Sequence, residues 1–276
     1  MAEQVGEIAA GATKPVRRGV QLTLFAYTGQ VHCSVKNACF AALNKIANER
    51  DWAVTLNEMI GDAMLPRARN AAVSLFMAST LTDLIMVDAD NYCSAADFLR
   101  LLDHDVDVVG AACRSRSEPL KWPIRWQHQP NIERSSNGLI EVDSVGSGIL
   151  RISRKCIEAM IAARPDDWYV DENVSARKSY ALFEYERSNN TWWGEDTTFC
   201  NRFRATGGKV WIDPDIETRH IGQVEYTASV TAWLQTLPRK IELVSPESNK
   251  VSWVQNTLSS QPQIVEADAP AMQAAE

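Results

Sequence analysis

Two aspartates separated by one residue follow a short apolar run. Residues 83–87 (DLIMV) have the composition of a buried strand, and Asp88 and Asp90 come directly after it. Ligand sites in open α/β sheets lie beyond the carboxyl ends of strands. Carboxylates suit Mg²⁺ or Mn²⁺, which such a pair can share with a substrate diphosphate. The pattern predicts a metal site at Asp88 and Asp90, although an aspartate in a turn before a helix would also explain it.

Two arginines and an asparagine stand near the start of the helix that precedes this strand. Arg67, Arg69 and Asn70 follow Pro66, a residue that is well tolerated in a first helical turn. Guanidinium groups bind phosphate in bidentate fashion, and a helix amino terminus adds free amides and a favourable dipole. The segment predicts a phosphate-binding group. Solvated charges of a first turn are the alternative interpretation.

A second pair of acids stands beside tryptophans. Glu195 and Asp196 follow Trp192 and Trp193, and a helical pattern begins with them. An acid in a partly dry cleft can serve as a general base, and indole faces stack on the apolar faces of sugar rings. Asp196, with Glu195 as a substitute, is therefore a candidate base, and Trp192, Trp193 and Trp122 are candidates for acceptor binding. Acids are also favoured at helix starts for the dipole alone.

His220 is the histidine placed best for chemistry. It follows the expected strand 209–213 and could ligate a metal through its imidazole, although a lone histidine is more often a surface or hydrogen-bonded residue. The other histidines and two nearby aspartates are interpreted as structural, surface or turn residues: His32, His104, His128, Asp213 and Asp215.

Alternating strand and helix patterns must position these residues. Strands are expected at 21–27, 53–60, 83–87 and 106–112, and helices at 34–50, 66–79 and 94–102. This alternation predicts an α/β fold with a mostly parallel central sheet and helices on both faces, in a single domain. Beyond a long loop at 116–138, strand-like pieces at 139–152, helices at 155–163 and 195–204 and a strand at 209–213 are expected.

Composition narrows the class of protein. The 276 residues carry 28 Lys and Arg against 35 Asp and Glu, a net charge of −7, which argues against a nucleic-acid partner. No apolar run approaches the ~20 residues of a transmembrane helix. The six cysteines include no CxxC pair, and the amino terminus has no secretory pattern, so a cytoplasmic location is expected.

Taken in order, these motifs resemble glycosyltransferases of the GT-A fold, especially those of family 2. The segments that carry the resemblance are 22–29, 61–70 (GDAMLPRARN), 83–90 (DLIMVDAD), 145–155 (VGSGILRISRK), 194–196 and 219–222. The resemblance implies a glycosyltransferase domain at 20–225. Outside it, composition predicts a flexible arm at 1–19 and a disordered tail at 255–276, and a helical extension is expected at 226–254. Within the domain, 20–115 would bind the nucleotide and 116–225 the acceptor.

The resemblance also implies an activity, which is metal-dependent transfer of a sugar from a nucleotide sugar, UDP- or GDP-linked, to a hydroxyl of a saccharide or other acceptor. Asp196 would be the general base of an inverting displacement, and Asp90 would bind Mn²⁺ or Mg²⁺. The resemblance further implies that Asp88 would contact the ribose or the metal and that His220 would contact the metal or the diphosphate. Tyr27 would lie near the nucleobase, and Arg69 and Asn70 near the nucleotide.

Some features depart from the family pattern. Residues 26–29 (AYTG) replace the usual proline and asparagine after the first strand, Pro66 and Arg67 are additions, and the QxxRW-type motif is absent. The chain therefore resembles a divergent member, of a phage or bacterial type. The alternatives are a nucleotidyltransferase with a similar sheet and a non-catalytic nucleotide- or glycan-binding module. A dehalogenase-type phosphatase is disfavoured, because its DxD motif follows the first strand.

Overall fold

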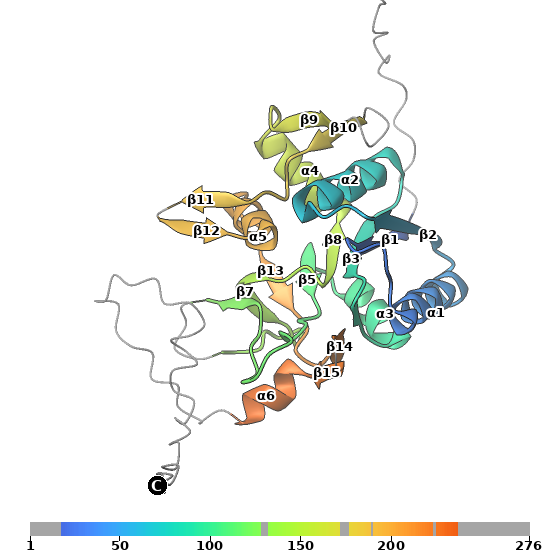
Figure 1. Cartoon of the computed structure of the whole chain (residues 1–276), viewed down its shortest axis with the longest axis vertical. Helices are drawn as coiled ribbons and strands as arrows, with labels where there is room; N and C mark the ends of the chain where they lie inside the picture. Colours follow the sequence, from blue (N-terminus) through green and yellow to red (C-terminus); the bar gives the residue numbers. More distant parts are fainter. Residues whose placement is uncertain (1–17, 128–131, 172–176, 189, 223–224, 237–276) are drawn as a thin grey trace, which may run out of the picture.

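The first part of the chain forms three parallel strands with helices between them. The computed structural model describes residues 18–127, 132–171, 177–188, 190–222 and 225–236 (Figure 1). It begins with β1 (Gly19–Ala26), α1 (Cys33–Arg50), β2 (Ala53–Ile60), α2 (Leu65–Ala78) and β3 (Asp83–Asp88). β1 pairs in parallel with both β2 and β3, and all of its residues are buried. Both faces of this part of the sheet are therefore covered.

After β3, the residues that the structure describes form short strands and four more helices. The next elements along the chain are β4 (Asn91–Tyr92), α3 (Ala95–Asp103), β5 (Val108–Gly110), β6 (Ile124–Trp126), β7 (Ile140–Val145), β8 (Ile149–Ser153) and α4 (Arg154–Ala163). They are followed by β9 (Trp168–Asp171), β10 (Arg177–Tyr180), β11 (Glu186–Ser188), β12 (Thr191–Trp193), α5 (Glu195–Ala205), β13 (Val210–Ile212), β14 (Thr218–Ile221), β15 (Glu225–Ala228) and α6 (Val230–Thr236).

The central sheet is mixed rather than mostly parallel. Its eight strands lie in the order β2-β1-β3-β8-β5-β13-β7-β6. Three neighbouring pairs are parallel, and the four that involve β7 or β8 are antiparallel. Parallel neighbours need a long crossover, usually a helix, and the described residues between β5 and β8 form none. The α/β prediction is confirmed for a single domain, and the expected mostly parallel sheet is corrected to a mixed one.

Helices cover the two faces of the sheet with separate hydrophobic cores. On one face, α1 and α3 pack their apolar sides, which include Ile46 and Phe98, against β1 and β3 (Figure 1). On the other face, α2, α4 and α5 contribute Phe76, Met160 and Phe199. Ser94 caps α3 in a capping box with Asp97, as expected for a serine at a helix start.

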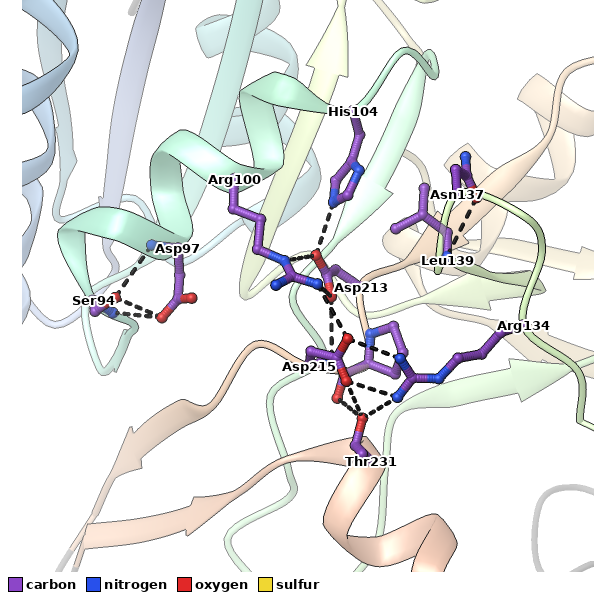
Figure 2. A network of polar contacts seen from close by, with 11 residues as sticks. Ser94, Asp97, Arg100, His104, Arg134, Asn137, Leu139, Asp213, Asp215 and Thr231 are labelled. Carbon is purple, nitrogen blue, oxygen red and sulfur yellow. Dashed lines mark hydrogen bonds and ion pairs between the residues drawn. The ribbon is translucent and has the colours of Figure 1, made fainter. Parts of the chain in front are cut away.

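A polar network connects α3 to the end of β13 and to α6 (Figure 2). Arg100 of α3 and His104, the C-cap residue of that helix, both contact the buried carboxylate of Asp213, with His104 Nε2 2.8 Å from Asp213 Oδ2. Arg134 and Thr231 contact Asp215 at 2.7 and 2.6 Å. His104, Asp213 and Asp215 therefore connect elements that are distant in the sequence.

Of the expected arm and tail, residues 1–17 and 237–276 lie outside the described residues, and α6 covers part of the expected helical extension. Within the described ranges, no helix is both long and apolar enough to cross a membrane.

Candidate active site

The DxD segment lies at the carboxyl end of β3, next to the turn that precedes β8. The amide of Ala89 donates to the carbonyl of Phe25 at the end of β1 (2.9 Å), and the amide of Asp88 donates to the carbonyl of Gly148 (2.9 Å). These bonds fix the backbone between Asp88 and Asp90 at the junction of β1, β3 and the turn at 146–148. A strand end of this kind is where ligand sites form in open α/β sheets.

Arg69 joins the DxD segment to the second acidic pair. Its Nη2 lies 3.0 Å from Asp88 Oδ1 and its Nε lies 3.4 Å from Glu195 Oε1. The side chain is 2% exposed and its guanidinium lies 4.8 Å from the centre of the Phe25 ring. Burial alone would lower the pKa of Arg69, but the charges of Asp88 and Glu195 raise it above its ordinary value. Arg69 is thus a buried counter-ion for carboxylates from both motifs.

Asp196 is a half-buried carboxylate beside this cluster. Its Oδ1 accepts a hydrogen bond from the amide of Thr197 at 2.6 Å, and a Cβ added to Gly146 would lie 3.6 Å from its Oδ2. Burial and the charge of Glu195 raise the pKa of Asp196 to about 6, with Arg69 acting in the opposite direction. The N-cap position of α5 is Gly194, so Asp196 is not the capping residue. A carboxylate with this pKa can accept a proton near neutral pH.

Asp90 faces a different pair of partners. His220 Nε2 lies 3.5 Å from Asp90 Oδ2, and Arg116 Nη1 lies 3.1 Å from the same oxygen. β14 brings His220 here because it pairs with β4, and the amide of Ile221 donates to the carbonyl of Asp90 (2.7 Å). The structure therefore places the late histidine next to the second aspartate of the DxD segment.

The imidazole of His220 is oriented by a backbone carbonyl. Its Nδ1 lies 2.7 Å from the carbonyl oxygen of Arg114, which leaves Nε2 facing Asp90. Burial lowers the pKa of His220, but the bonds to Asp90 and Arg114 raise it by more. Within the described ranges, no group of three or more His, Cys, Asp or Glu side chains is arranged to hold a metal ion. Asp90 and His220 form a pair, while Asp88 is bonded to Arg69.

Asn70 and Arg67 have protein partners that the sequence did not indicate. Asn70 is fully buried, and its Oδ1 accepts hydrogen bonds from the amides of Leu182 (3.1 Å) and Phe183 (2.9 Å). Arg67 forms a bidentate pair with Asp62 at 2.8 and 2.9 Å. A nucleotide would have to displace these bonds to engage either side chain. Both residues contact protein here, and a nucleotide contact for them stays a prediction.

The candidate aromatic contacts differ in accessibility. Trp122 is only 4% exposed and packs against Trp233, so its ring cannot stack on an acceptor. Trp193 stacks under the guanidinium of Arg125 at 4.0 Å. Trp192 is 64% exposed, and Tyr27, at the end of β1, is about half exposed. Of the three predicted tryptophans, Trp192 offers the most open ring.

Two residues at the site were missed by sequence reasoning. Arg116 lies in the loop after β5 and contacts Asp90, and Tyr185 lies just before β11, beside Trp192. Arg116 lies in a long proline-rich stretch without helical or strand periodicity, so nothing in the sequence beyond its charge indicated a place at the site. Each strand of the β11–β12 hairpin has only three residues, and alternation of apolar and polar residues over so short a stretch cannot be recognised in the sequence.

No protein-family model matches the chain, and no curated protein matches it. Among solved structures, one described as the crystal structure of A197 from STIV is similar, with a TM-score of 0.45 and 14% sequence identity. The match covers 77% of this chain and 91% of that chain.

Proposed function

We propose that this protein is a glycosyltransferase of the GT-A type that transfers a sugar from a nucleoside diphosphate sugar to a hydroxyl acceptor. One observation carries the proposal: Arg69 bonds both Asp88 and Glu195, so the two acidic motifs, far apart in the sequence, meet at one strand end. A strand-end aspartate pair beside an acid with a near-neutral pKa suits displacement of a phosphate leaving group by an activated hydroxyl.

Asp196 is the proposed general base. It accepts the proton of the acceptor hydroxyl while that oxygen forms a bond to the anomeric carbon. The bond from that carbon to the donor phosphate breaks, and the nucleoside diphosphate leaves with the electron pair. Attack from the face opposite the leaving group inverts the anomeric centre. The raised pKa of Asp196, caused by burial and by Glu195, supports this role because the base must gain a proton in the transition state.

A divalent cation, Mg²⁺ or Mn²⁺, would be held by Asp90 and His220. The residues fit such an ion in one respect: His220 directs Nε2 toward Asp90 while Nδ1 is bonded to a carbonyl, the arrangement common among ligating histidines. Two protein ligands suffice for ions of this kind when substrate phosphates and water complete the coordination. When bound, the cation would offset the charge that develops on the leaving diphosphate.

The nucleoside of the donor is proposed to lie across the ends of β1 and β2. Tyr27 follows β1 and is more than half exposed, and Ile60 and Met64 are also exposed at the end of β2 and beyond it. Ala26 and Ile60 are paired in register, and the amides of Gly29 and Gly61 both donate to the carbonyl of Ala26. These groups lie at or just beyond the carboxyl ends of β1 and β2, and β1 is the neighbour of β3, so a flat base could pack there beside the DxD segment.

Thermal stabilisation by nucleotide sugars tests the proposal. UDP-, GDP-, CMP- and dTDP-sugars are screened with and without Mn²⁺, and we expect stabilisation by one diphosphate sugar that depends on the ion. Asp90→Ala should abolish that stabilisation, while Asp103→Ala, which changes an exposed acid at the end of α3, should retain it. Stabilisation by nucleoside triphosphates alone would indicate a nucleotidyltransferase instead. No stabilisation by any diphosphate sugar would contradict the proposal.

A further inference from the structure

Tyr185 and Trp192 form an exposed aromatic pair at the base of the β11–β12 hairpin, which we call the aromatic platform. Their ring centroids are 5.9 Å apart at an interplanar angle of 32°, and their exposed fractions are 46% and 64%. Arg187 is opposite Trp192 in the antiparallel register, and Tyr185 is two residues before Arg187. The two rings therefore lie on one face of the hairpin, because side chains alternate along a strand.

The aromatic platform lies beside the proposed base. Trp192 is three residues before Glu195, at the start of α5. Burial raises the pKa of the Tyr185 hydroxyl, the charges of Glu195 and Asp196 raise it further, and Arg69 opposes them. β12 leads directly into α5, so a ligand on the rings would lie at the amino-terminal end of the helix that carries Asp196.

The chain that leads into Tyr185 is held firmly by buried contacts. Asn70 accepts from the amide of Phe183 at 2.9 Å and donates to its carbonyl at 3.0 Å. The Phe183 ring stacks on Phe199 of α5, with centroids 4.4 Å apart and an interplanar angle of 3°. Because α5 also carries Asp196, the aromatic platform and the base are attached to the same helix. Their relative position is fixed before any ligand binds.

The groups around the aromatic platform suit a ligand with an apolar face and polar edges. Arg187 lies opposite Trp192, on the face of the hairpin that carries both rings, and Glu186 is opposite Trp193 on the other face. The acids near the rings are Glu195 and Asp196, whose charges act on the Tyr185 hydroxyl. Flat aromatic faces bind apolar surfaces of similar size, and the carboxylates can accept hydrogen bonds from hydroxyls. A neutral ring with one apolar face and a rim of hydroxyls satisfies both requirements. A pyranose has that form.

We propose that the aromatic platform binds a pyranose ring of a saccharide acceptor and presents one of its hydroxyls to Asp196. The inference rests on the proposed function, because the hydroxyl presented is the one that Asp196 would deprotonate. Tyr185 thereby becomes an acceptor-binding residue, and the acceptor is a saccharide.

Saturation-transfer NMR with simple sugars tests the inference. The probes are methyl β-D-glucopyranoside, methyl β-D-galactopyranoside, methyl α-D-mannopyranoside and methyl N-acetyl-β-D-glucosaminide, with adenosine and tetramethylammonium as ligands for other aromatic sites. We expect at least one pyranoside to bind the wild-type protein and to bind about tenfold more weakly to Trp192→Ala and Tyr185→Ala. Tyr185→Phe should restore binding, because the ring is retained.

Trp168→Ala is the matched control. Trp168 is also an exposed indole, 45% accessible, but it lies on β9 under the ammonium of Lys178 at 4.4 Å. This variant should bind the pyranosides like the wild type. The inference is overturned if no pyranoside binds, if binding survives in both Trp192→Ala and Tyr185→Ala, or if only adenosine or tetramethylammonium depends on these residues.

Failure of this inference can be told apart from failure of the proposed function. Stabilisation by the Mn²⁺ and diphosphate-sugar combination should be unchanged in Trp192→Ala, because the donor binds at the strand ends. If that stabilisation is present and pyranoside binding is independent of the aromatic platform, the platform assignment alone is wrong. If pyranoside binding depends on the platform and no diphosphate sugar stabilises the protein, the platform assignment is supported and the transfer reaction is wrong.

Discussion

At the scale of single residues, the free-energy cost of ionising Asp196 is the property of the site that most affects both its chemistry and the stability of the fold. Its carboxylate is half-buried and adjoins Glu195, so ionisation is opposed by desolvation and by a like charge. The same effect that makes it a base near neutral pH makes its charged form unfavourable for the fold. The ionised form of Asp196 therefore lowers the free energy of unfolding at the pH where the base is active.

Replacing Asp196 with Asn should stabilise the protein above pH 6 and change little near pH 4. The folded pKa of about 6 exceeds the ordinary value of 3.8, so the favourable contribution of the protonated acid is lost as pH rises through about 6. The expected gain is about 3 kcal/mol at pH 7.5, from a difference of about 2 pKa units at about 1.4 kcal/mol each. Urea unfolding at pH 4 and 7.5 measures it, and an equal effect at both pH values would show that the pKa is not raised.

Arg69 should be among the most costly residues to replace. Arg69→Met leaves Asp88 and Glu195 without their shared cation inside the protein, which should cost about 3 to 5 kcal/mol. Arg67→Met, two positions earlier, removes a more exposed pair with Asp62 and should cost far less than Arg69→Met. Chemical denaturation compares the two variants. Similar losses would mean that Arg69 is not the counter-ion of the acidic cluster.

The sequence indicated which residue types belong to the site better than it indicated their partners. Asp88, Glu195 and Arg69 were singled out from spacing and do meet in space, linked by the two ion pairs of Arg69. Asn70 was expected near a nucleotide, and the structure shows that its side chain bonds the backbone at Leu182 and Phe183, which the sequence did not indicate. Whether a polar group faces a ligand or the interior depends on tertiary packing, which no local pattern records.

At the scale of elements, α2 holds the segment before β11 through Asn70. Asn70→Ala should cost about 2 to 4 kcal/mol, because it leaves the buried amides of Leu182 and Phe183 without their acceptor. Amide hydrogen exchange should accelerate at those two residues. In Ser74→Ala, one turn later on the same helix, exchange there should stay at the wild-type rate. Unchanged exchange in Asn70→Ala would contradict this role.

The elements themselves were predicted unevenly. α1 and β2 agree with the expected ranges to within a residue, because their apolar spacing and boundaries are regular. The antiparallel insertion of β8 between β3 and β5 was not foreseen, since it depends on pairing over long sequence separations. The β11–β12 hairpin escaped prediction because its strands are short.

At the scale of the whole molecule, the network around Asp213 connects α3, β13 and, through Asp215, α6 (Figure 2). Burial raises the pKa of Asp213, but the bonds to His104 and Arg100 lower it by more. Its stabilising contribution is therefore present above the ordinary value of 3.8 and is lost as pH falls below it. The pH dependence is opposite in sign to that of Asp196.

Asp213→Asn should lower stability by about 2 to 4 kcal/mol at pH 7, with a smaller loss near pH 3.5. Asp215→Asn, which changes a more exposed partner in the same network, should cost about 1 kcal/mol or less. Thermal unfolding across this pH range measures both. A loss in Asp213→Asn that does not vary with pH would show that the ionised carboxylate is not what stabilises the network.

The most direct measurement is the release of nucleoside diphosphate from the stabilising donor sugar, with Mn²⁺ and a pyranoside that binds the protein. We expect the wild-type rate to rise with pH through an apparent pKa of about 6, the value for Asp196. Asp196→Asn should bind the donor equally well and release product at least about 100-fold more slowly. Release by that variant at the wild-type rate, or none by the wild type, would contradict the account.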